Sequence, residues 1–241
     1  MQILKAVCPK EEAEIREMHK RQSELHLVPT PLCYLDIEVQ DKSGIVVTKY
    51  SDRSKSWVRN FYNWMVTQQM SCGSSILGTT YGAGTLAVKG TDGIVRSYGV
   101  YAARLEEVTS GYGYRGAAGS TTNGIVAGTG NAAESFESHI LDSLIANGTG
   151  AGQLQYQEMS APTPVWDSQN KAFTLELERI MINNSGGAID VKEVGLIALL
   201  IYTISATSMF LVARDVLSSS VNVPNESQIK ATYTIQIVYP A

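Results

Sequence analysis

The sequence predicts a mainly β protein of the α+β type, with an antiparallel, β-sandwich-like core, a long aromatic helix packed on that core and an N-terminal helix. Three observations lead to this prediction. The last third of the chain consists of β-branched, aromatic and leucine residues in short runs separated by Ser, Thr, Asn and Pro, which is typical of strands joined by turns. One central segment carries aromatic residues at helical spacing. Charged residues make up only 17% of the 241 residues, which suits a turn-rich β protein whose surfaces are covered by neighbours.

The final strand shows the clearest alternation in the chain. From Ile229 to Ile237 every second residue is apolar or aromatic, and the residues between them are Lys, Thr and Gln. Such alternation is expected of an antiparallel strand with one solvated face. A similar alternation begins at Phe173, and the turn signal from Asn183 to Gly187 leads from it into the C-terminal sheet. We therefore expect this sheet to be a structural platform.

The apolar stretch from Val194 to Ala213 has two interpretations. It contains no charged residue, and about 20 apolar residues can span a bilayer as a helix. However, the polar residues between Tyr202 and Ser208 lie near its midpoint, and the apolar runs on either side suit buried strands. We therefore expect a buried hairpin and no membrane partner, and a membrane-associated protein is the alternative.

The segment from Ser51 to Met70 has the pattern of a long helix, which Ser51, Asp52 or Ser54 could cap. Its large apolar residues recur at i, i+4, i+7 and i+8, so we expect this face to pack flat across a sheet. The expected core anchors are Trp57, Phe61, Trp64 and Met65. The alternative is a platform that stacks nucleic-acid bases, but such platforms are usually spread over strands and accompanied by many basic residues.

A second helix is expected near the N-terminus, before the β-rich part of the chain. Pro9 suits a first helical turn, and the glutamates that follow it favour the positive end of the helix dipole. Pro29 and Pro31 end this helix. Because its apolar stripe is narrow, the helix either lies on the surface of its own domain or docks against another subunit. We therefore divide the chain into an N-terminal arm and helix, residues 1–31, and a β-rich domain, residues 32–241, that includes helix 51–70.

The remaining segments are predicted from shorter patterns. Further strands are expected in a hairpin from Cys33 to Tyr50 and within Gly84–Val88, Gly93–Val100 and Gly124–Ala127, with a helix at Ala132–Ala146. The loop from Gly111 to Gly119 is rich in tyrosine, and such a loop either adapts to a partner or remains a disordered surface loop. The N-terminal helix and this loop supply the candidate interface residues Ile15, Met18, Leu25, Tyr112, Tyr114 and Arg115.

Sequence motifs for chemistry are missing. None of the three histidines lies in a catalytic motif, and Cys8, Cys33 and Cys72 have neither metal-ligand nor disulfide spacing. The net charge of −4 argues against a general nucleic-acid binder. We therefore expect no enzyme activity, cofactor, metal, nucleic acid or small-molecule substrate. An active site assembled from distant residues is the alternative, because such sites are set by geometry and not by order in the chain.

Four short motifs in the C-terminal part of the chain resemble a known group of proteins. They are Glu193-Val-Gly-Leu-Ile, Leu211-Val-Ala-Arg-Asp-Val-Leu, Val221-Asn-Val-Pro and Thr232-Tyr-Thr-Ile-Gln-Ile. In this order they resemble the C-terminal strands of virion proteins of tailed bacteriophages, and Ser56-Trp-Val-Arg-Asn-Phe-Tyr-Asn and Ile125-Val-Ala-Gly-Thr-Gly-Asn resemble them too. The resemblance covers about half of the chain. One departure is Pro224-Asn-Glu-Ser, which replaces the glycine-bearing turn of those proteins.

The resemblance implies a non-enzymatic structural protein of the neck, collar or tail region. Its partners would be copies of itself and other virion proteins, and it would be made in the host cytoplasm and function in the virion. The low charge and the narrow apolar stripe of the N-terminal helix agree with a homo-oligomer that completes its burial against other subunits. A capsid decoration protein or a receptor-binding fibre protein is the alternative.

Overall fold

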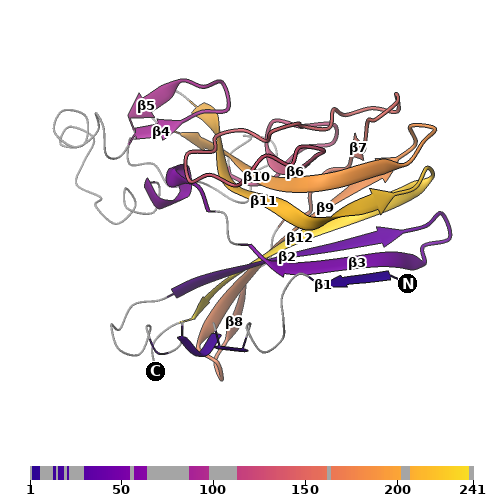
Figure 1. The fold of residues 1–241 in the computed structure, drawn as a ribbon. Coiled ribbons are helices and arrows are strands. Elements are labelled where there is room, and N and C mark those ends of the chain that lie inside the picture. The colour runs from indigo at the N-terminus through magenta and orange to yellow at the C-terminus, as the bar shows by residue number, and fades with distance from the viewer. Residues whose placement is uncertain are drawn as a thin grey trace.

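The computed structural model describes residues 2–5, 13–14, 16–18, 21, 30–54, 57–63, 87–97, 113–161, 164–201 and 207–238. These residues form a mainly β structure with antiparallel sheets (Figure 1). The larger sheet has the order β1-β3-β2-β12-β9-β7, with β8 paired to β9, and the smaller sheet has the order β11-β10-β6. Among the described strand pairs, β1–β3 is parallel and the others are antiparallel.

The strands have the following bounds. In the larger sheet they are β1 (Gln2–Lys5), β2 (Thr30–Gln40), β3 (Val46–Arg53), β7 (Gln155–Tyr156), β8 (Val165–Asp167), β9 (Ala172–Asn183) and β12 (Ser227–Val238). In the smaller sheet they are β6 (Gly124–Gly128), β10 (Ile189–Ile201) and β11 (Thr207–Val223). A separate hairpin consists of β4 (Ala87–Lys89) and β5 (Val95–Ser97).

The two sheets share one hydrophobic core, to which both contribute buried side chains. Polar side chains also cross between the sheets. The Tyr233 hydroxyl of β12 donates to Asp215 Oδ2 of β11 at 2.8 Å, and the Arg179 guanidinium of β9 donates to the carbonyl oxygen of Ile125 in β6 at 2.9 Å. Burial of the apolar faces stabilises this packing, and the hydrogen bonds restrict how the two sheets are aligned.

The predicted C-terminal hairpin is confirmed. Strands β10 and β11 pair antiparallel from Ile189↔Val223 to Ile201↔Thr207, so the apolar stretch forms two adjacent strands. Within the described part of the chain, no helix is long and apolar enough to cross a membrane. The predicted hairpin of β2 and β3 and the short strands β4, β5 and β6 are also present.

The long helix predicted for residues 51–70 is wrong. Residues 51–53 continue β3, where Ser51 pairs with Asp36 and Arg53 with Tyr34 of β2. Helical structure is described only at residues 59–63, after a β-bridge between Trp57 and Ala213. Pairing with β2 satisfies the backbone of residues 51–53, and this long-range pairing outweighs the local capping signal.

The helix predicted at Ala132–Ala146 is also wrong, because these residues form an irregular loop. The loop crosses the edge of β6, where the amide of Ile145 donates to the carbonyl oxygen of Ala127 and the amide of Thr129 donates to that of Ser143. Near the N-terminus, the described residues 13–14, 16–18 and 21 are helical, in agreement with the predicted N-terminal helix. Helical structure in the described chain is therefore limited to two short segments.

Candidate functional site

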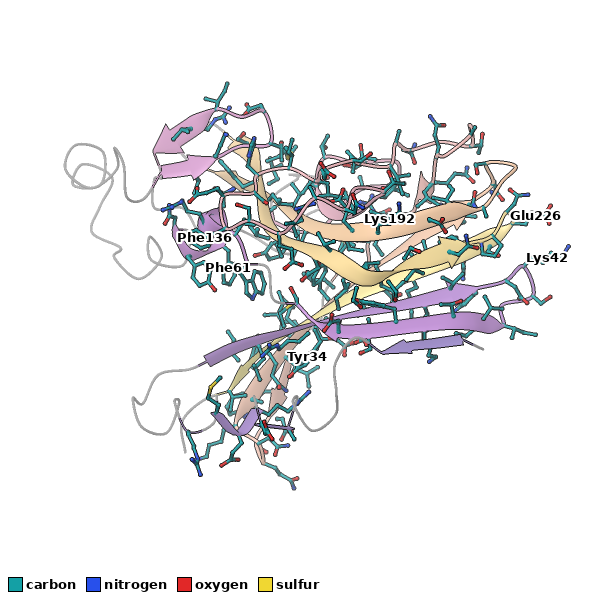
Figure 2. All side chains as sticks on the ribbon, viewed as in Figure 1. Tyr34, Lys42, Phe61, Phe136, Lys192 and Glu226 are labelled. Atoms are coloured by element: carbon teal, nitrogen blue, oxygen red, sulfur yellow. The ribbon has the colours of Figure 1, made fainter. Side chains whose placement is uncertain are left out.

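The most distinctive surface feature is a row of aromatic rings that runs from the core to the solvent. Trp57 and Phe61 stack with ring centroids 3.8 Å apart, Phe61 meets Tyr62 edge-on at 5.6 Å, and Tyr62 lies 5.7 Å from Phe136. Phe61 is buried, whereas Tyr62 and Phe136 are each 47% exposed. Figure 2 shows Phe61 and Phe136 close together beside the short helix of residues 59–63. The inner rings anchor this row, and the outer two rings present apolar surface to solvent.

The short helix is fixed to the edge of the smaller sheet. The amide of Val58 donates to the carbonyl oxygen of Val212 at 3.1 Å. The buried side chain of Asn60 donates to the carbonyl oxygens of Leu211 and Lys89, and its Oδ1 accepts from the amide of Lys89 at 2.8 Å. Asn60 therefore holds β4, β11 and the helix together, and it positions the aromatic rings and the β4–β5 hairpin relative to each other.

Arg59 connects the helix to the loop that carries Phe136. Its guanidinium lies over the Phe136 ring at 4.9 Å and donates to both carboxylate oxygens of Glu137, and its amide donates to the carbonyl oxygen of Phe136 at 2.8 Å. The hydrogen bond from Arg59 lowers the pKa of Glu137, and the nearby charge of Lys89 adds a smaller effect in the same direction. The site thus has two basic side chains, Arg59 and Lys89, and one carboxylate, Glu137, near the exposed rings.

A pocket of about 310 Å³ opens beside these groups, between the β4–β5 hairpin and the loop. Its rim includes Val95, whose side chain is 62% exposed, and the adjacent Ile94 is 56% exposed. The pocket is lined by Arg59, Asn60, Lys89, Val95, Glu137, Ser138 and His139. We call the exposed surface formed by Arg59, Tyr62, Lys89, Val95, Phe136 and Glu137 the aromatic patch. Exposed rings beside an arginine are typical of the centres of protein–protein interfaces.

A buried ion pair anchors the loop that carries Phe136. The Arg214 Nε of β11 donates to Glu193 Oε2 of β10 at 2.7 Å, and both side chains are almost fully buried. Glu193 also accepts from the amides of Asp142 and Ser143, and Arg214 donates to the carbonyl oxygens of residues 132 and 133. One pair of strands therefore fixes both ends of the loop, residues 132–143.

Two glycines make this anchorage possible. A Cβ atom at Gly128 would lie 2.5 Å from Glu193 Oε1 and 2.6 Å from the carbonyl oxygen of Ser143. A Cβ atom at Gly130 would lie 2.5 Å from Glu193 Oε1 and 2.5 Å from the Cβ of Asp142. All four distances are too short for a real Cβ atom. The glycines of the Gly128-Thr-Gly130 motif therefore admit the Glu193 carboxylate and bring the loop close to the sheet.

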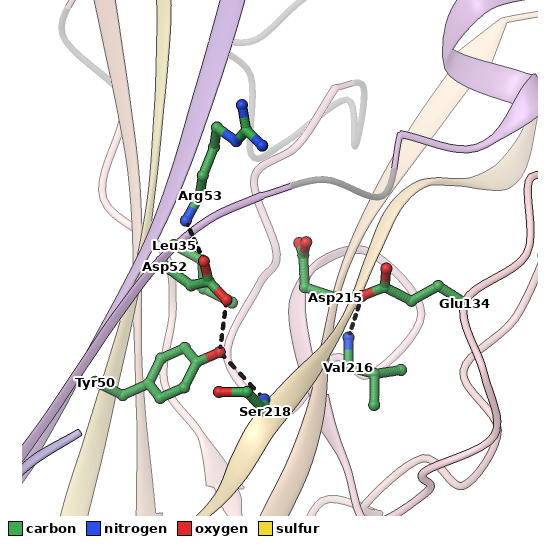
Figure 3. A pocket seen from close by; sticks show the side chains of 8 residues that line it. All are labelled: Leu35, Tyr50, Asp52, Arg53, Glu134, Asp215, Val216 and Ser218. Carbon is green, nitrogen blue, oxygen red and sulfur yellow. Dashed lines mark hydrogen bonds between the residues drawn. The ribbon is translucent and has the colours of Figure 1, made fainter. Parts of the chain in front are cut away.

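A second pocket, of about 270 Å³, lies where the two sheets meet (Figure 3). Its carboxylates are already hydrogen-bonded within the chain: Asp52 accepts from the Tyr50 hydroxyl, Glu134 from the amide of Val216, and Asp215 from the Ser54 hydroxyl. The lining residues are Leu35, Tyr50, Asp52, Arg53, Glu134, Asp215, Val216 and Ser218. Among the described residues, no group of three His, Cys, Asp or Glu side chains could hold a metal ion. Because the pocket's carboxylates are hydrogen-bonded within the chain, we assign this pocket a structural role.

The structure places the predicted site residues in different environments. Phe61 is buried and Trp57 is partly buried against the core, while Trp64 and Met65 lie outside the described residues. Of the predicted interface residues, Met18 is 49% exposed. Tyr114 is buried, and Arg115 donates to the carbonyl oxygen of Met159 at 2.8 Å and to Glu158 at 3.1 Å. Ile15, Leu25 and Tyr112 also lie outside the described residues.

Sequence reasoning missed Tyr62, Phe136, Glu193 and Arg214 as site residues. The signal for Glu193 and Arg214 was present, since each is a charged residue within an apolar strand.

Comparisons with known proteins add no family, because the chain matches no family model, no curated protein and no solved structure. The geometry and the sequence motifs are therefore the basis for a functional proposal.

Proposed function

We propose that the chain is a non-enzymatic structural subunit of a tailed-phage virion, of the neck, collar or tail type. In this proposal its two packed sheets form a β-sandwich body, and the aromatic patch docks on a neighbouring subunit. The observation that carries the docking proposal is the exposure of the residues Tyr62 and Phe136, 47% each, next to the Arg59 guanidinium. The virion assignment is supported by the C-terminal sequence motifs alone.

The composition of the patch supports docking in preference to catalysis. Tyrosine, phenylalanine and arginine are enriched in protein–protein interfaces, and the residues that dominate the binding energy lie in well-packed centres. The backbone hydrogen bond from Arg59 to Phe136 and the buried Glu193–Arg214 pair hold the Phe136 loop in place, so the loop needs little further ordering when a partner binds. A rigid, exposed aromatic surface of this kind is therefore suited to a subunit contact.

The test is the molar mass of the purified protein, measured by size-exclusion chromatography with light scattering over a range of concentrations. We expect the wild type to self-associate and the double variant Tyr62→Ser/Phe136→Ser to self-associate at least about tenfold more weakly, since truncating a dominant interface residue costs more than about 1 kcal/mol. Electron microscopy of particles that contain the protein would test the virion assignment.

The matched control is Ile45→Ser, which removes an exposed apolar side chain in the turn between β2 and β3. Circular dichroism would check that each variant folds. A wild type that remains monomeric at the highest accessible concentration would overturn self-assembly. A double variant that associates as strongly as the wild type would exclude the aromatic patch as the contact.

A further inference from the structure

We propose that the aromatic patch of one copy binds the exposed face of the N-terminal helical segment of a second copy. This inference rests on the proposed function and names the occupant of the patch. Two surfaces of the chain are involved, and each is described by contacts and exposure within the same structure.

The helical segment contacts β2 through Arg16, and all of its described residues are exposed. The Arg16 guanidinium lies 4.7 Å from the centre of the Tyr34 ring of β2. Glu14, Glu17, Met18 and Arg21 follow the spacing i, i+3, i+4, i+7, which places them together on the other side of the helix. All four are exposed, and Met18 is 49% exposed. The segment therefore presents two carboxylates, a methionine and a guanidinium on one surface.

The patch is complementary to this face in charge and in apolar character. Arg59 and Lys89 supply two cations for the two glutamates of the helix, and Glu137 supplies a carboxylate for Arg21. Beside these charges are the exposed rings of Tyr62 and Phe136, with the Arg59 guanidinium over the Phe136 ring, and a methionine sulfur makes favourable contacts with aromatic rings. The helix face carries an excess of one negative charge and the patch an excess of one positive charge.

The ion pairs within each surface can be replaced by ion pairs between the two surfaces, so that every charged side chain keeps a partner of opposite charge. Arg21 lies 3.5 Å from Glu17 in the helix, and Arg59 is paired with Glu137 in the patch. Both pairs are solvent-exposed, and such pairs contribute little to stability, so their rearrangement costs little. Opposite charges on two surfaces also favour one orientation of docking over others.

The two surfaces belong to different regions of the chain. Figure 2 shows Tyr34, against which the helical segment lies, well separated from Phe61 and Phe136. The contact is therefore made between copies and not within one copy. Because the helix of each copy binds a different surface on the next copy, the interface is heterologous, and such contacts generate closed rings or open filaments.

The experiment uses two variants of the full chain that each lack one of the two surfaces. The helix variant is Glu14→Lys/Glu17→Lys, and the patch variant is Lys89→Glu/Phe136→Ser. Because a heterologous contact needs one intact surface from each partner, each variant alone should remain monomeric. An equimolar mixture should form a one-to-one dimer that does not grow further, because the intact helix of the patch variant binds the intact patch of the helix variant. Native mass spectrometry would measure both results.

The control is Asp190→Lys/Glu226→Lys, which makes the same change in net charge at two exposed positions away from both surfaces and should assemble as the wild type does; Figure 2 shows Glu226 beside Lys42, far from Tyr34 and Phe136. Circular dichroism confirms folding. If the patch variant loses assembly but the helix variant assembles normally, the proposed function stands and this inference is wrong. If the mixture of the two variants remains monomeric, the inference is also wrong. If the wild type itself does not assemble, the proposed function fails as well.

Discussion

Tyr233 of β12 and Asp215 of β11 join the two sheets through the core. The Tyr233 hydroxyl donates to Asp215 Oδ2 at 2.8 Å, and the Ser54 hydroxyl donates to the same oxygen at 2.8 Å. Tyr233 has no exposed surface and Asp215 is 6% exposed. Burial, together with the Asp215 charge, raises the pKa of Tyr233 well above its ordinary value, so its hydroxyl remains a donor at neutral pH. The link between the sheets is therefore a satisfied polar network.

We expect Tyr233→Phe to lower the free energy of unfolding by about 1–3 kcal/mol, because it removes one donor from a buried carboxylate and leaves the packing of the ring nearly unchanged. Urea denaturation followed by tryptophan fluorescence would measure the change. The control is Tyr62→Phe, which removes the hydroxyl of an exposed tyrosine and should leave stability nearly unchanged. Equal stability of Tyr233→Phe and the wild type would show that this hydrogen bond makes no net contribution.

The buried pair Glu193–Arg214 gives a second prediction. Arg214→Met leaves the Glu193 carboxylate in the core without its cation, and breaking a buried pair in this way costs about 3–5 kcal/mol. We also expect faster hydrogen exchange in residues 132–143, because Arg214 and Glu193 bond the backbone at both ends of that loop. Denaturation and hydrogen exchange measured by mass spectrometry would test the two effects.

The exposed pair Arg59–Glu137 provides the contrast for this prediction. Glu137→Gln removes a carboxylate from a solvent-exposed ion pair, and such pairs contribute little to stability. We therefore expect no measurable change in unfolding for Glu137→Gln. If Arg214→Met behaves like Glu137→Gln, or if exchange in the loop is unchanged, the buried pair does not anchor the loop.

The elements predicted correctly are those with strong local patterns. Strand β9 follows the alternation that begins at Phe173, and β12 follows the alternation that begins at Ile229. The same alternation places Arg179 and Asn183 on the buried face of β9, where they are 1% and 0% exposed. A charged or polar residue at an inward position of an otherwise regular strand therefore marks a buried polar network.

The elements predicted incorrectly depend on contacts between distant residues. Residues 51–53 have a plausible helix cap, but pairing with β2 incorporates them into a strand. The candidate site depends on the same kind of contact, since Tyr62 and Phe136 meet although more than seventy residues separate them in the chain. Hydrophobic periodicity describes one segment at a time, and so it could not predict this ring contact.

Arg179 supports a third prediction. Its guanidinium lies in the core with 1% of the residue exposed, and it donates to four carbonyl oxygens, those of Ala117, Asn123, Ile125 and Gln157. Burial lowers its pKa to about 10, which still leaves it protonated at neutral pH. The charge is thus balanced by backbone dipoles and by the Tyr156 ring at 4.9 Å.

We expect Arg179→Lys to destabilise the protein by about 2–4 kcal/mol, because an ammonium group cannot reproduce the planar arrangement of donors and leaves buried carbonyls unpaired. Urea denaturation would measure the loss. The control is Arg115→Lys, since Arg115 also donates to a carbonyl oxygen, that of Met159, but has a partly exposed side chain. A smaller loss for Arg179→Lys than for Arg115→Lys would contradict the assigned role.

The outer face of the larger sheet predicts a loss of stability in acid. Glu38 of β2 pairs with Lys49 of β3 at 2.5 Å and with Lys230 of β12 at 3.3 Å. The hydrogen bond from Lys49 lowers the pKa of Glu38 below its usual value of 4.5, and the hydrogen bond from Lys230 has a smaller effect in the same direction. The stabilisation that Glu38 contributes through these ion pairs is therefore fully present above about pH 4.5. It is lost as the pH falls through the lower pKa that Glu38 has in the folded state. We expect the difference in unfolding free energy between the wild type and Glu38→Gln, measured by urea denaturation, to shrink below about pH 4.5. The control is Glu176→Gln, which removes a carboxylate from β9 on the same face of the sheet. If the difference for Glu38→Gln stays constant with pH, the ion pairs do not stabilise the sheet.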